Sequence, residues 1–548
     1  MPLNSEEVTY LIDRNEKLKS NRQQYESLWE EIAQYIFPGR VGIGYKPTPG
    51  AKQTANLFDS SAIFSNDQLA ASMCGTITPA ATLWFALKLA DDRLNHIKPI
   101  MDWLELCTRL LDFARHRSNF YAEVPEVYLD LGAFGEGCLL VDEKPIGMMG
   151  FNGFYYKALS NSEYCTSENY EGLVDTVFRE FELSARVAVK KFGDKVGEKI
   201  KSQLNKKPDE KFPFLHAVFP NENGNSKPFV SYYLNLDEKK LISEGGYYDL
   251  PYVVPRWRKS SGEDYGRGPG HIALPDVKSL NKAKEFGLKA WAKDLDPPTF
   301  ERDGGVIGKL KMFPGGRNIV KDKEAIWMLD RRTRYDVSQI KEDALRQSIR
   351  QIFYSDQLNL PDKSEMREIE VYVRYELMQR LLGPAVGRFE IELLKPTIER
   401  EFGIMMRARA LPPPPPILAK MGIREIDIEY ENPLAKAQRA NEAKSIQTLY
   451  SFASIIAQSQ PPDVVSSPMD NIDSDAAIRH GAEISGAPSK IIRSVEEVQA
   501  IREMRAKKIA AEKQKQDMER LAQGLGDVSP ALKVASEIMQ GGEGTPGA

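Results

Sequence analysis

The strongest constraint on the fold of this chain is a long helical pattern that prolines interrupt. It runs from about Ser364 to Met406, and it contains Gly383, Pro384 and Pro396. A proline inside a helix removes a backbone N–H donor and crowds the preceding turn, at a cost of about 3 kcal/mol. We therefore expect the helix to kink at Gly383, Pro384 and Pro396, and contacts outside the helix must stabilise the bend.

Two shorter helical patterns precede this one and enclose a stretch of a different kind. The first covers 277–295, with Asp276 as its expected N-cap and two prolines after it, and the second covers about 336–353. Turn signals and short strand-like runs lie between them. These features predict a stalk of two helices with a small β-rich tip. Residues 299–335 hold nine Lys and Arg against five Asp and Glu, a local charge of +4.

The first half of the chain combines helical and strand patterns. Residues 4–37 form an amphipathic helical pattern, and a second helix rich in small residues is expected after Asp59. From about 135 to 257 the pattern changes to short runs with strand character, interrupted by one amphipathic helix. The sequence therefore predicts an α+β fold. At 548 residues, two to four domains are expected.

The last part of the chain is again helical by pattern. LPPPPPIL at 411–418 is typical of polyproline II, and it serves either as a stiff spacer or as a ligand for an SH3-like groove. Polar amphipathic helices follow over 431–525. The glycine-rich end predicts a disordered tail over 526–548.

Composition excludes several classes of protein. The net charge is −4, with 42% hydrophobic and 28% charged residues, which argues against a strongly basic nucleic-acid binder. No apolar run is long enough for a membrane span, and the N-terminus has no apolar signal core. We expect no membrane association. The four cysteines have neither CxxC spacing nor a histidine at ligand spacing, so reduced core residues are expected.

The sequence contains no convincing catalytic motif. Five histidines are scattered without metal-ligand spacing. GGVIGKL at 304–310 is one residue short of a phosphate loop and has Leu310 at the hydroxyl position, which favours a turn in the tip. GRGPGH at 266–271 lacks a helix directly after it, because the next expected helix begins only at Val277. We predict no catalytic residues, no metal site and no cofactor, and hence a protein that is not an enzyme.

Three segments together resemble the head-to-tail connecting, or portal, proteins of short-tailed, podovirus-type bacteriophages. The first is NLFDSSAIFSNDQLAASMCGTITPAATLWFAL at 56–87. The second, at 370–407, contains the Leu-Gly-Pro and Leu-Lys-Pro breaks and Arg-Glu-Phe, as the kinked helix of that family does. The third is IEYENPLAKAQRANEAKSI at 428–446.

The resemblance implies a division of the chain into named parts. These are a wing at 1–275, a stem of helices at 276–296 and 336–354, a clip at 297–335, a tunnel loop at 355–365, a kinked long helix returning to the wing at 366–430, and a crown at 431–525. It also implies a homo-oligomeric ring, usually a dodecamer, at one capsid vertex, through which double-stranded DNA is packaged and ejected.

The resemblance further implies partners and candidate contact residues. Lys363 and Arg367 become candidates for transient contact with DNA phosphates in the tunnel. The basic clip residues become candidates for contact with DNA or with acidic partner surfaces: Arg302, Lys309, Lys311 and Arg317. Expected partners are the terminase large subunit, tail adaptor proteins, and major capsid and scaffolding proteins. Internal core proteins are a further candidate.

The expected location is the portal vertex of the virion, with assembly in the host cytoplasm. Two alternatives of other classes stay open at this point. One is a DNA-packaging enzyme, an ATPase or nuclease, for which GGVIGKL and the basic tip argue. The other is an adaptor protein that uses its proline motif.

Overall fold

The structure is a computed structural model in which two compact units are distinguished. One unit comprises Met1–Asn95 and Trp103–Arg439, and the other comprises His96–Asp102 and Ala440–Ala548. The residues described are 5–540, except 46–47, 49, 51, 96, 146, 148–149, 223–226, 296–298, 310, 312–316, 325, 329–334, 359–381, 422–425, 431–432, 460–467, 485–490 and 494.

The largest sheet of the first unit is antiparallel and five-stranded, in the order β4-β5-β6-β7-β8. Its strands are β4 (Tyr164–Glu168), β5 (Val174–Ser184), β6 (Lys211–Pro220), β7 (Phe229–Asn235) and β8 (Lys240–Tyr247). Phe178 lies opposite Ala217, and Leu215 lies opposite Leu234. These four apolar side chains are buried against α1 (Ser5–Tyr35), which supplies Val8 and Leu11. The strand-rich region predicted from about 135 is therefore confirmed.

Three short helices pack against this sheet and form a second hydrophobic cluster with it. They are α6 (Ala185–Phe192), η2 (Gly193–Val196) and α7 (Glu198–Leu204), and they bury Ala188, Val196 and Ile200 with Phe214. A second sheet has the order β3-β2-β9 and consists of β2 (Cys138–Glu143), β3 (Phe154–Leu159) and β9 (Tyr252–Val253). The two sheets share a hydrophobic core that includes Cys138 and Val177. The mixture of helices and antiparallel sheets is the predicted α+β fold.

The remaining elements of the N-terminal region are mostly helical. They are η1 (Pro38–Arg40), α2 (Ser61–Thr76), β1 (Phe85–Leu89), α3 (Asp92–Asn95), α4 (Lys98–His116) and α5 (Phe120–Phe134). The N-cap of α2 is Ser60, so the expectation that Asp59 caps this helix is wrong by one position. Asp59 precedes the cap and accepts a hydrogen bond from the Ser61 N–H at 2.9 Å. Strand β1 pairs with β14 (Ile426–Tyr430). A segment that follows the long helix in sequence therefore lies beside a strand of the N-terminal region.

The glycines of GRGPGH pack against the end of α5. A Cβ atom on Gly266 would lie 2.2 Å from the Gly135 carbonyl oxygen, and one on Gly270 would lie 2.1 Å from that of Ala133. Gly135 itself ends α5 with a φ of 74°, a conformation that favours glycine. The motif is thus a site of close backbone packing between this loop and α5.

Helix α8 (Pro269–Leu295) begins inside the same motif, so the expected start at Val277 is wrong. Proline is well suited to the first position of a helix, because its missing N–H would have no partner there. Asp276 lies within the helix and does not cap it. Its carboxylate instead accepts a hydrogen bond from the Ser348 hydroxyl at 2.7 Å.

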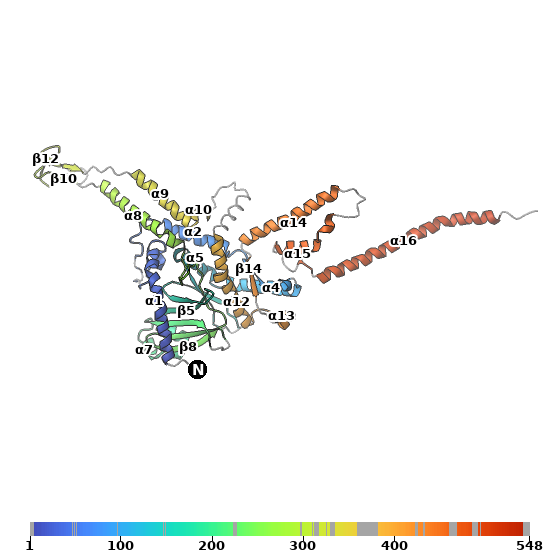
Figure 1. Cartoon of the computed structure of the whole chain (residues 1–548), viewed down its shortest axis with the longest axis horizontal. Coiled ribbons are helices and arrows are strands. Elements are labelled where there is room, and N and C mark those ends of the chain that lie inside the picture. Colours follow the sequence, from blue (N-terminus) through green and yellow to red (C-terminus); the bar gives the residue numbers. More distant parts are fainter. Residues whose placement is uncertain are drawn as a thin grey trace, which may run out of the picture. The chain divides into compact units, whose positions relative to one another are not determined.

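The predicted stalk is formed by α8 and α9 (Tyr335–Ile352), which lie side by side in Figure 1. They are antiparallel: Asp276 meets Ser348, and farther along the stalk Lys284 forms an ion pair with Glu342 at 3.1 Å. At the far end, β10 (Thr299–Glu301) pairs with β13 (Ile326–Met328), and β11 (Val306–Ile307) pairs with β12 (Ile319–Val320). The chain thus has the predicted two-helix stalk with a β-rich tip.

The described part of the long helix begins at residue 382. Residues 382–389 are α-helical, Glu390–Leu394 form a π-helical segment labelled η3, and α12 (Lys395–Arg407) continues from it. Helix α13 (Pro416–Met421) follows the proline run. A short helix, α10 (Ser355–Leu358), follows α9, so the first four residues of the predicted tunnel loop are helical. Its other residues lie outside the described residues.

The second unit contains helices only among its described elements. They are α14 (Pro433–Ser459, which begins in the first unit), η4 (Pro468–Asn471), α15 (Ser474–Ile484) and α16 (Val495–Gln540). Arg502 forms two 2.6 Å hydrogen bonds with Asp475, which join α16 to α15. The prediction of a disordered tail from 526 is wrong up to Gln540. Helical spacing of Val528, Leu532 and Met539 continues there, although glycines lie on both sides.

Replacing Gly270 by alanine tests the close packing of the loop on α5. The new Cβ atom would overlap the Ala133 carbonyl oxygen, so we expect a loss of about 3 kcal/mol in the free energy of unfolding. Gly75→Ala is the matched control, because no atom lies within 4 Å of the added Cβ in α2. Chemical denaturation measures both variants. Equal stability of Gly270→Ala and the unchanged protein would contradict the packing described.

Candidate functional site

The predicted basic residues of the tip all lie on its surface. Arg302, Lys309, Lys311 and Arg317 are exposed around the β11–β12 hairpin. The Gly305 N–H donates to the Arg302 carbonyl at 2.7 Å, and the Lys311 N–H donates to Asn318 Oδ1 at 2.7 Å. Turns therefore hold the backbone at two of these positions. The four residues therefore lie together around one hairpin. Their contact with DNA or with a partner protein stays a prediction.

GGVIGKL forms part of this hairpin. Gly304 and Gly308 have φ angles of 66° and 101°, and β11 lies between them. A phosphate loop requires a helix directly after the glycines, whereas this segment turns into a strand pair. The interpretation as a turn in the tip agrees with this geometry. Leu310, Lys363 and Arg367 lie outside the described residues.

The residues predicted to kink the long helix lie in two places. Gly383 and Pro384 are at the start of its described part, and Pro396 follows the π-helical segment directly. The Lys395 N–H donates to the Glu390 carbonyl, five residues back, as in a π-helix. A wider turn relieves the clash between a proline ring and the carbonyl four residues before it. The kink itself stays a prediction, with Pro396 and this turn as its physical basis.

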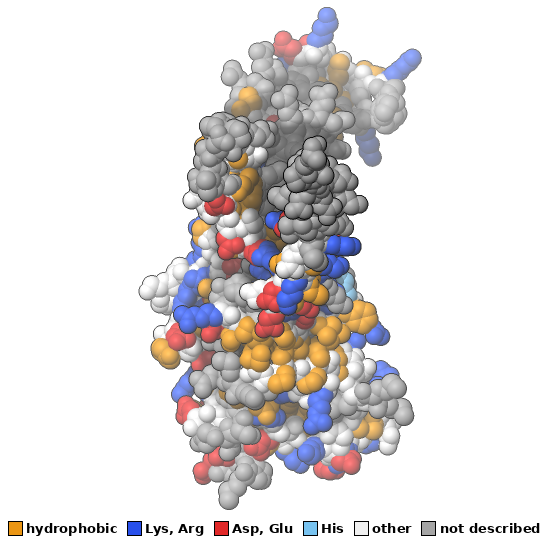
Figure 2. All heavy atoms as spheres, turned by 90° about the vertical axis from the view of Figure 1, so that its right-hand side faces the viewer, with side chains coloured by type: hydrophobic (Ala, Val, Ile, Leu, Met, Phe, Trp, Pro, Cys, Tyr) orange, Lys and Arg blue, Asp and Glu red, His pale blue; other side chains and the backbone are white. Residues whose placement is uncertain are grey.

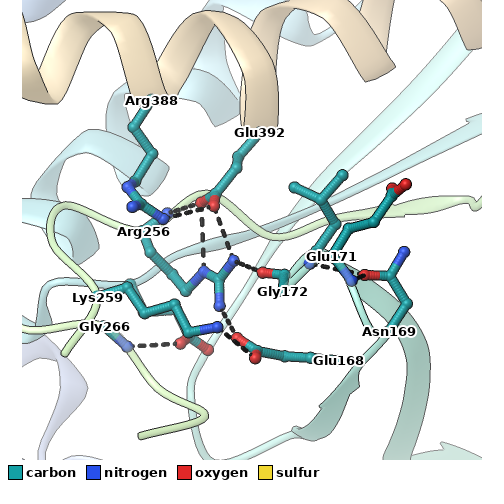
Figure 3. Close-up of polar contacts among 11 residues, drawn as sticks. Glu168, Asn169, Glu171, Gly172, Arg256, Lys259, Gly266, Arg388 and Glu392 are labelled. Carbon is teal, nitrogen blue, oxygen red and sulfur yellow. Dashed lines mark hydrogen bonds and ion pairs between the residues drawn. The ribbon is translucent and has the colours of Figure 1, made fainter. Parts of the chain in front are cut away.

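A buried ion-pair network holds the π-helical segment to the rest of the first unit (Figure 3). Arg256, which is fully buried, donates to Glu392 through Nη2 at 2.7 Å and through its backbone N–H at 2.9 Å. Arg388 donates to the same carboxylate at 2.9 Å. On the other side, Arg256 and Lys259 both pair with Glu168. The network thus joins η3, strand β4 and the segment after β9.

The charges in this network are matched. Burial acts to lower the pKa of Arg256, but the hydrogen bonds and charge of Glu392, together with Glu136 and Glu168, outweigh it and raise the pKa. The guanidinium therefore stays charged. A buried cation of this kind is tolerated only where carboxylates surround it.

Glu136 is a second buried carboxylate at the same place. It accepts hydrogen bonds from the Tyr164 hydroxyl at 3.0 Å and from the Gly266 N–H at 3.1 Å. Complete burial raises its pKa to about 7, although the Gly266 N–H and Arg256 oppose the shift. Glu136 therefore connects α5 and β4 to the glycine-rich loop that leads into α8.

The Arg-Glu-Phe sequence at 400–402 anchors α12 at a second place. Glu401 forms a fully buried ion pair with Arg115 of α4, and the Tyr156 hydroxyl donates to Glu401 at 2.6 Å. Arg400 donates to the Val141 carbonyl at 2.7 Å, and Phe402 meets Trp103 edge to face at 6.2 Å. Each of the three side chains thus has a different partner in the fold.

Sequence reasoning missed most of these partners. Arg115, Arg256 and Glu136 carry no motif, and their partners lie far away in the sequence. The available signal was an ionisable residue inside an apolar run, such as Arg256 in PYVVPRW. Such a residue must be paired if the run is buried.

The proline run lies beside α4. Its Leu411 is buried, and the Trp103 indole N–H donates to the Pro412 carbonyl at 3.0 Å. Leu106 and Phe113 of α4 and Ile417 of α13 are exposed, and Figure 2 shows hydrophobic side chains gathered on one face of the molecule. The run is therefore partly packed, as expected of a spacer, and its use as a ligand stays an open prediction.

The family model of the bacteriophage head to tail connecting protein matches residues 9–492. The chain belongs to this family. It therefore has the function of a portal protein at the connection between head and tail of a phage particle. Portal proteins are structural proteins.

Two phage relatives agree with this assignment. The portal protein of Salmonella phage epsilon15 is 28% identical over 527 residues, which cover 91% of each chain. The probable portal protein of Bordetella phage BPP-1 is 28% identical over 519 residues, covering 90% of each. A chain from the neck of a native GTA particle with C12 symmetry aligns with 76% of this chain and 94% of its own length, at 11% identity and a TM-score of 0.34.

In the described part of the chain, no three His, Cys, Asp or Glu side chains are placed to hold a metal ion. The four cysteines are free, and burial raises the pKa of the Cys74 and Cys107 thiols to about 12. Among the helices described, none is long and apolar enough to span a membrane.

The pH dependence of stability tests the environment of Glu136. Its pKa is raised above the unfolded value, so its contribution to stability is fully present below about pH 4.5 and is lost as the pH rises through about 7. We expect the free energy of unfolding to fall between pH 5 and pH 8 by about 2 to 3 kcal/mol relative to that of Glu136→Gln. An equal difference in free energy of unfolding between the two proteins at pH 5 and at pH 8 would contradict the assignment.

Proposed function

We propose that copies of this portal protein form a closed ring through which double-stranded DNA passes. In this proposal α8 and α9 are the stem, 297–335 is the clip, 1–275 contributes the wing, and 431–525 contributes the crown. The observation that carries the proposal is a stripe of large apolar side chains on α8 that the subunit leaves exposed.

The stripe is the continuation of a buried one. Ala273, Val277 and Leu280 recur every three or four residues on α8 and are buried in the first unit. The same spacing leads to Leu288, Trp291 and Leu295, which are 48%, 57% and 67% exposed. Side chains of this size, grouped on one side of a helix, favour burial against another protein surface.

A second apolar surface lies on another side of the same helix. Ile272 and Phe286 are 58% and 57% exposed, and about four helical turns separate them. In a ring with heterologous contacts, each subunit presents different faces to its two neighbours. Two exposed apolar sides on one stem helix suit that arrangement. A dodecamer is the expected number of subunits, as the family resemblance implies.

The charges of the chain suit a channel that does not hold DNA tightly. The tip carries a local charge of +4, whereas the whole chain has a net charge of −4. Each neutralised phosphate adds about 0.9 to the salt dependence of binding, so many basic contacts would arrest a moving duplex. Few and dispersed contacts, with Lys363 and Arg367 as candidates, permit sliding.

We assign the exposed basic tip to partner binding. In the ring, the clip would meet the terminase large subunit during packaging and tail adaptor proteins afterwards, and the wing would face capsid and scaffolding proteins. Arg302, Lys309, Lys311 and Arg317 are exposed at the end of the stalk, where a docking protein has access to them. Assembly in the host cytoplasm belongs to the same proposal.

Replacing Trp291 by serine tests the apolar stripe. Truncation of a buried interface tryptophan costs about 2 kcal/mol or more per interface, so we expect rings to give way to smaller species. Lys293→Ser is the matched control, because it truncates a neighbouring exposed residue outside the stripe. Sedimentation velocity of the full chain measures the distribution of species. Unchanged rings in Trp291→Ser would contradict the role of the stripe.

Charge reversal at Lys363 and Arg367 tests the proposed tunnel contacts. Lys363→Glu with Arg367→Glu should leave ring formation intact, lower the DNA content of assembled particles, and reduce the salt slope of duplex binding by about 0.9 for each lost phosphate contact. Arg186→Glu with Lys190→Glu, on exposed positions of α6, makes the same charge change elsewhere. Normal DNA content in the first variant would remove both residues from the contact set.

A further inference from the structure

A polar pocket of about 340 Å³ lies in the first unit, away from the stalk. It is bounded by the end of β2, the segment 150–152, the end of β8 and one side of α12. Six charged side chains line it: Asp142, Glu143, Lys144, Lys227, Arg400 and Arg407. We call this cavity the Arg400 pocket.

Arg400 is a buried cation whose partners do not use all of its donors. The residue is 2% exposed, and it donates through Nε to the Val141 carbonyl at 2.7 Å and through Nη1 to the Asp249 carbonyl at 2.8 Å. Its Nη2 has no hydrogen bond to any described residue, and the nearest carboxylate oxygen, on Asp142, is 3.6 Å away. The guanidinium thus has donor capacity left where it lines the pocket.

The electrostatics of Arg400 agree with this geometry. Burial lowers its pKa, and the charge of Asp142 compensates only in part. This is the reverse of Arg256, where neighbouring carboxylates outweigh the effect of burial. A buried arginine that lacks full compensation is stabilised by any carboxylate that enters beside it.

The surroundings suit one negative charge. Lys144, Lys227 and Arg407 add to Arg400, while Asp142 and Glu143 line the pocket and Asp249 pairs with Arg407 at 3.3 Å. Four cations against three carboxylates leave an excess of one positive charge. A single carboxylate matches this excess, whereas a polyphosphate chain would be repelled by the three acids.

The walls favour a peptide. Tyr247 and Tyr248 line the pocket, and the guanidinium groups of Arg400 and Arg407 lie 4.9 Å and 4.6 Å from their rings. Aromatic walls can cover the methylene groups of an acidic side chain. Strand β8 is the outermost strand of its sheet, and a Cβ added to Gly245 would meet no atom within 4 Å. An extended chain can therefore approach this edge and hydrogen-bond to it.

We propose that the Arg400 pocket binds a carboxylate side chain of an extended acidic peptide in a protein partner, with the peptide backbone beside the end of β8. The carboxylate accepts a hydrogen bond from Arg400 Nη2, and Lys144 and Lys227 stabilise its charge at the rim. This site is separate from the stem and the tip, and it does not rest on ring formation.

The test uses the full chain and two fluorescein-labelled peptides. One has the sequence Thr-Val-Thr-Val-Glu-Val-Thr-Val-Thr, and the other has Gln in place of Glu. Fluorescence anisotropy should show binding of the Glu peptide that is about tenfold tighter than that of the Gln peptide. Lys144→Ala with Lys227→Ala should abolish most of this difference. Lys240→Ala, at the other end of β8, is the matched control and should preserve it.

Three results would overturn the proposal. Equal affinity for the Glu and Gln peptides, or no binding of either, excludes carboxylate recognition. Full binding by Lys144→Ala with Lys227→Ala places any binding elsewhere. Displacement of the Glu peptide by an unlabelled DNA duplex, with loss of duplex binding in the same variant, assigns the pocket to nucleic acid. Both lysines lie at the rim, and the 3.0 Å hydrogen bond from Lys227 Nζ to the Gly246 carbonyl is exposed, so its loss should change thermal unfolding little.

Discussion

The geometry of the first unit depends on one requirement: the buried guanidinium of Arg256 must be surrounded by carboxylates. Its partners come from distant segments, Glu392 in the π-helical turn and Glu168 in β4. Removal of Glu392 would leave the buried cation with Glu168 as its remaining ion-pair partner, and breaking a buried ion pair costs about 3 to 5 kcal/mol in proteins. The ion pairs therefore fix where the long helix crosses the sheets. The π-helical turn at Glu390–Leu394, and Pro396 directly after it, lie where these ion pairs hold the helix.

A second set of contacts fixes the direction in which α12 continues. Glu401 is paired with Arg115 in the core, and Phe402 packs on Trp103 beside the proline run. At the opposite end, Glu136 and the glycines around Gly268 attach the start of α8 to α5. The stalk thus begins from a rigid base, while its outer half exposes Leu288, Trp291 and Leu295. These contacts at the base and the exposed apolar side chains along α8 suit the ring proposed above.

Much of the fold could be predicted from the sequence, because periodicity reports which side of an element is buried. The strands between 135 and 257, the stalk and its turn-rich tip followed from such patterns. The start of α8 did not, since Pro269 and two glycines suggested a loop where the structure has close packing and a helix. Buried pairs such as Arg256 with Glu392 join residues far apart in sequence, and no local pattern indicates which residue pairs with which. The family resemblance supplied the connector function, which composition alone would not have given.

The central claim is that this portal protein completes its fold as a ring, with the apolar stripe of α8 covered by a neighbouring copy. Electron microscopy of the purified full chain, viewed end on, tests it most directly. The account predicts closed rings with a central channel wide enough for a DNA duplex and with the stem helices in contact between adjacent subunits. Particles that remain single subunits at high protein concentration, or rings in which Trp291 of every copy stays exposed to solvent, would contradict it.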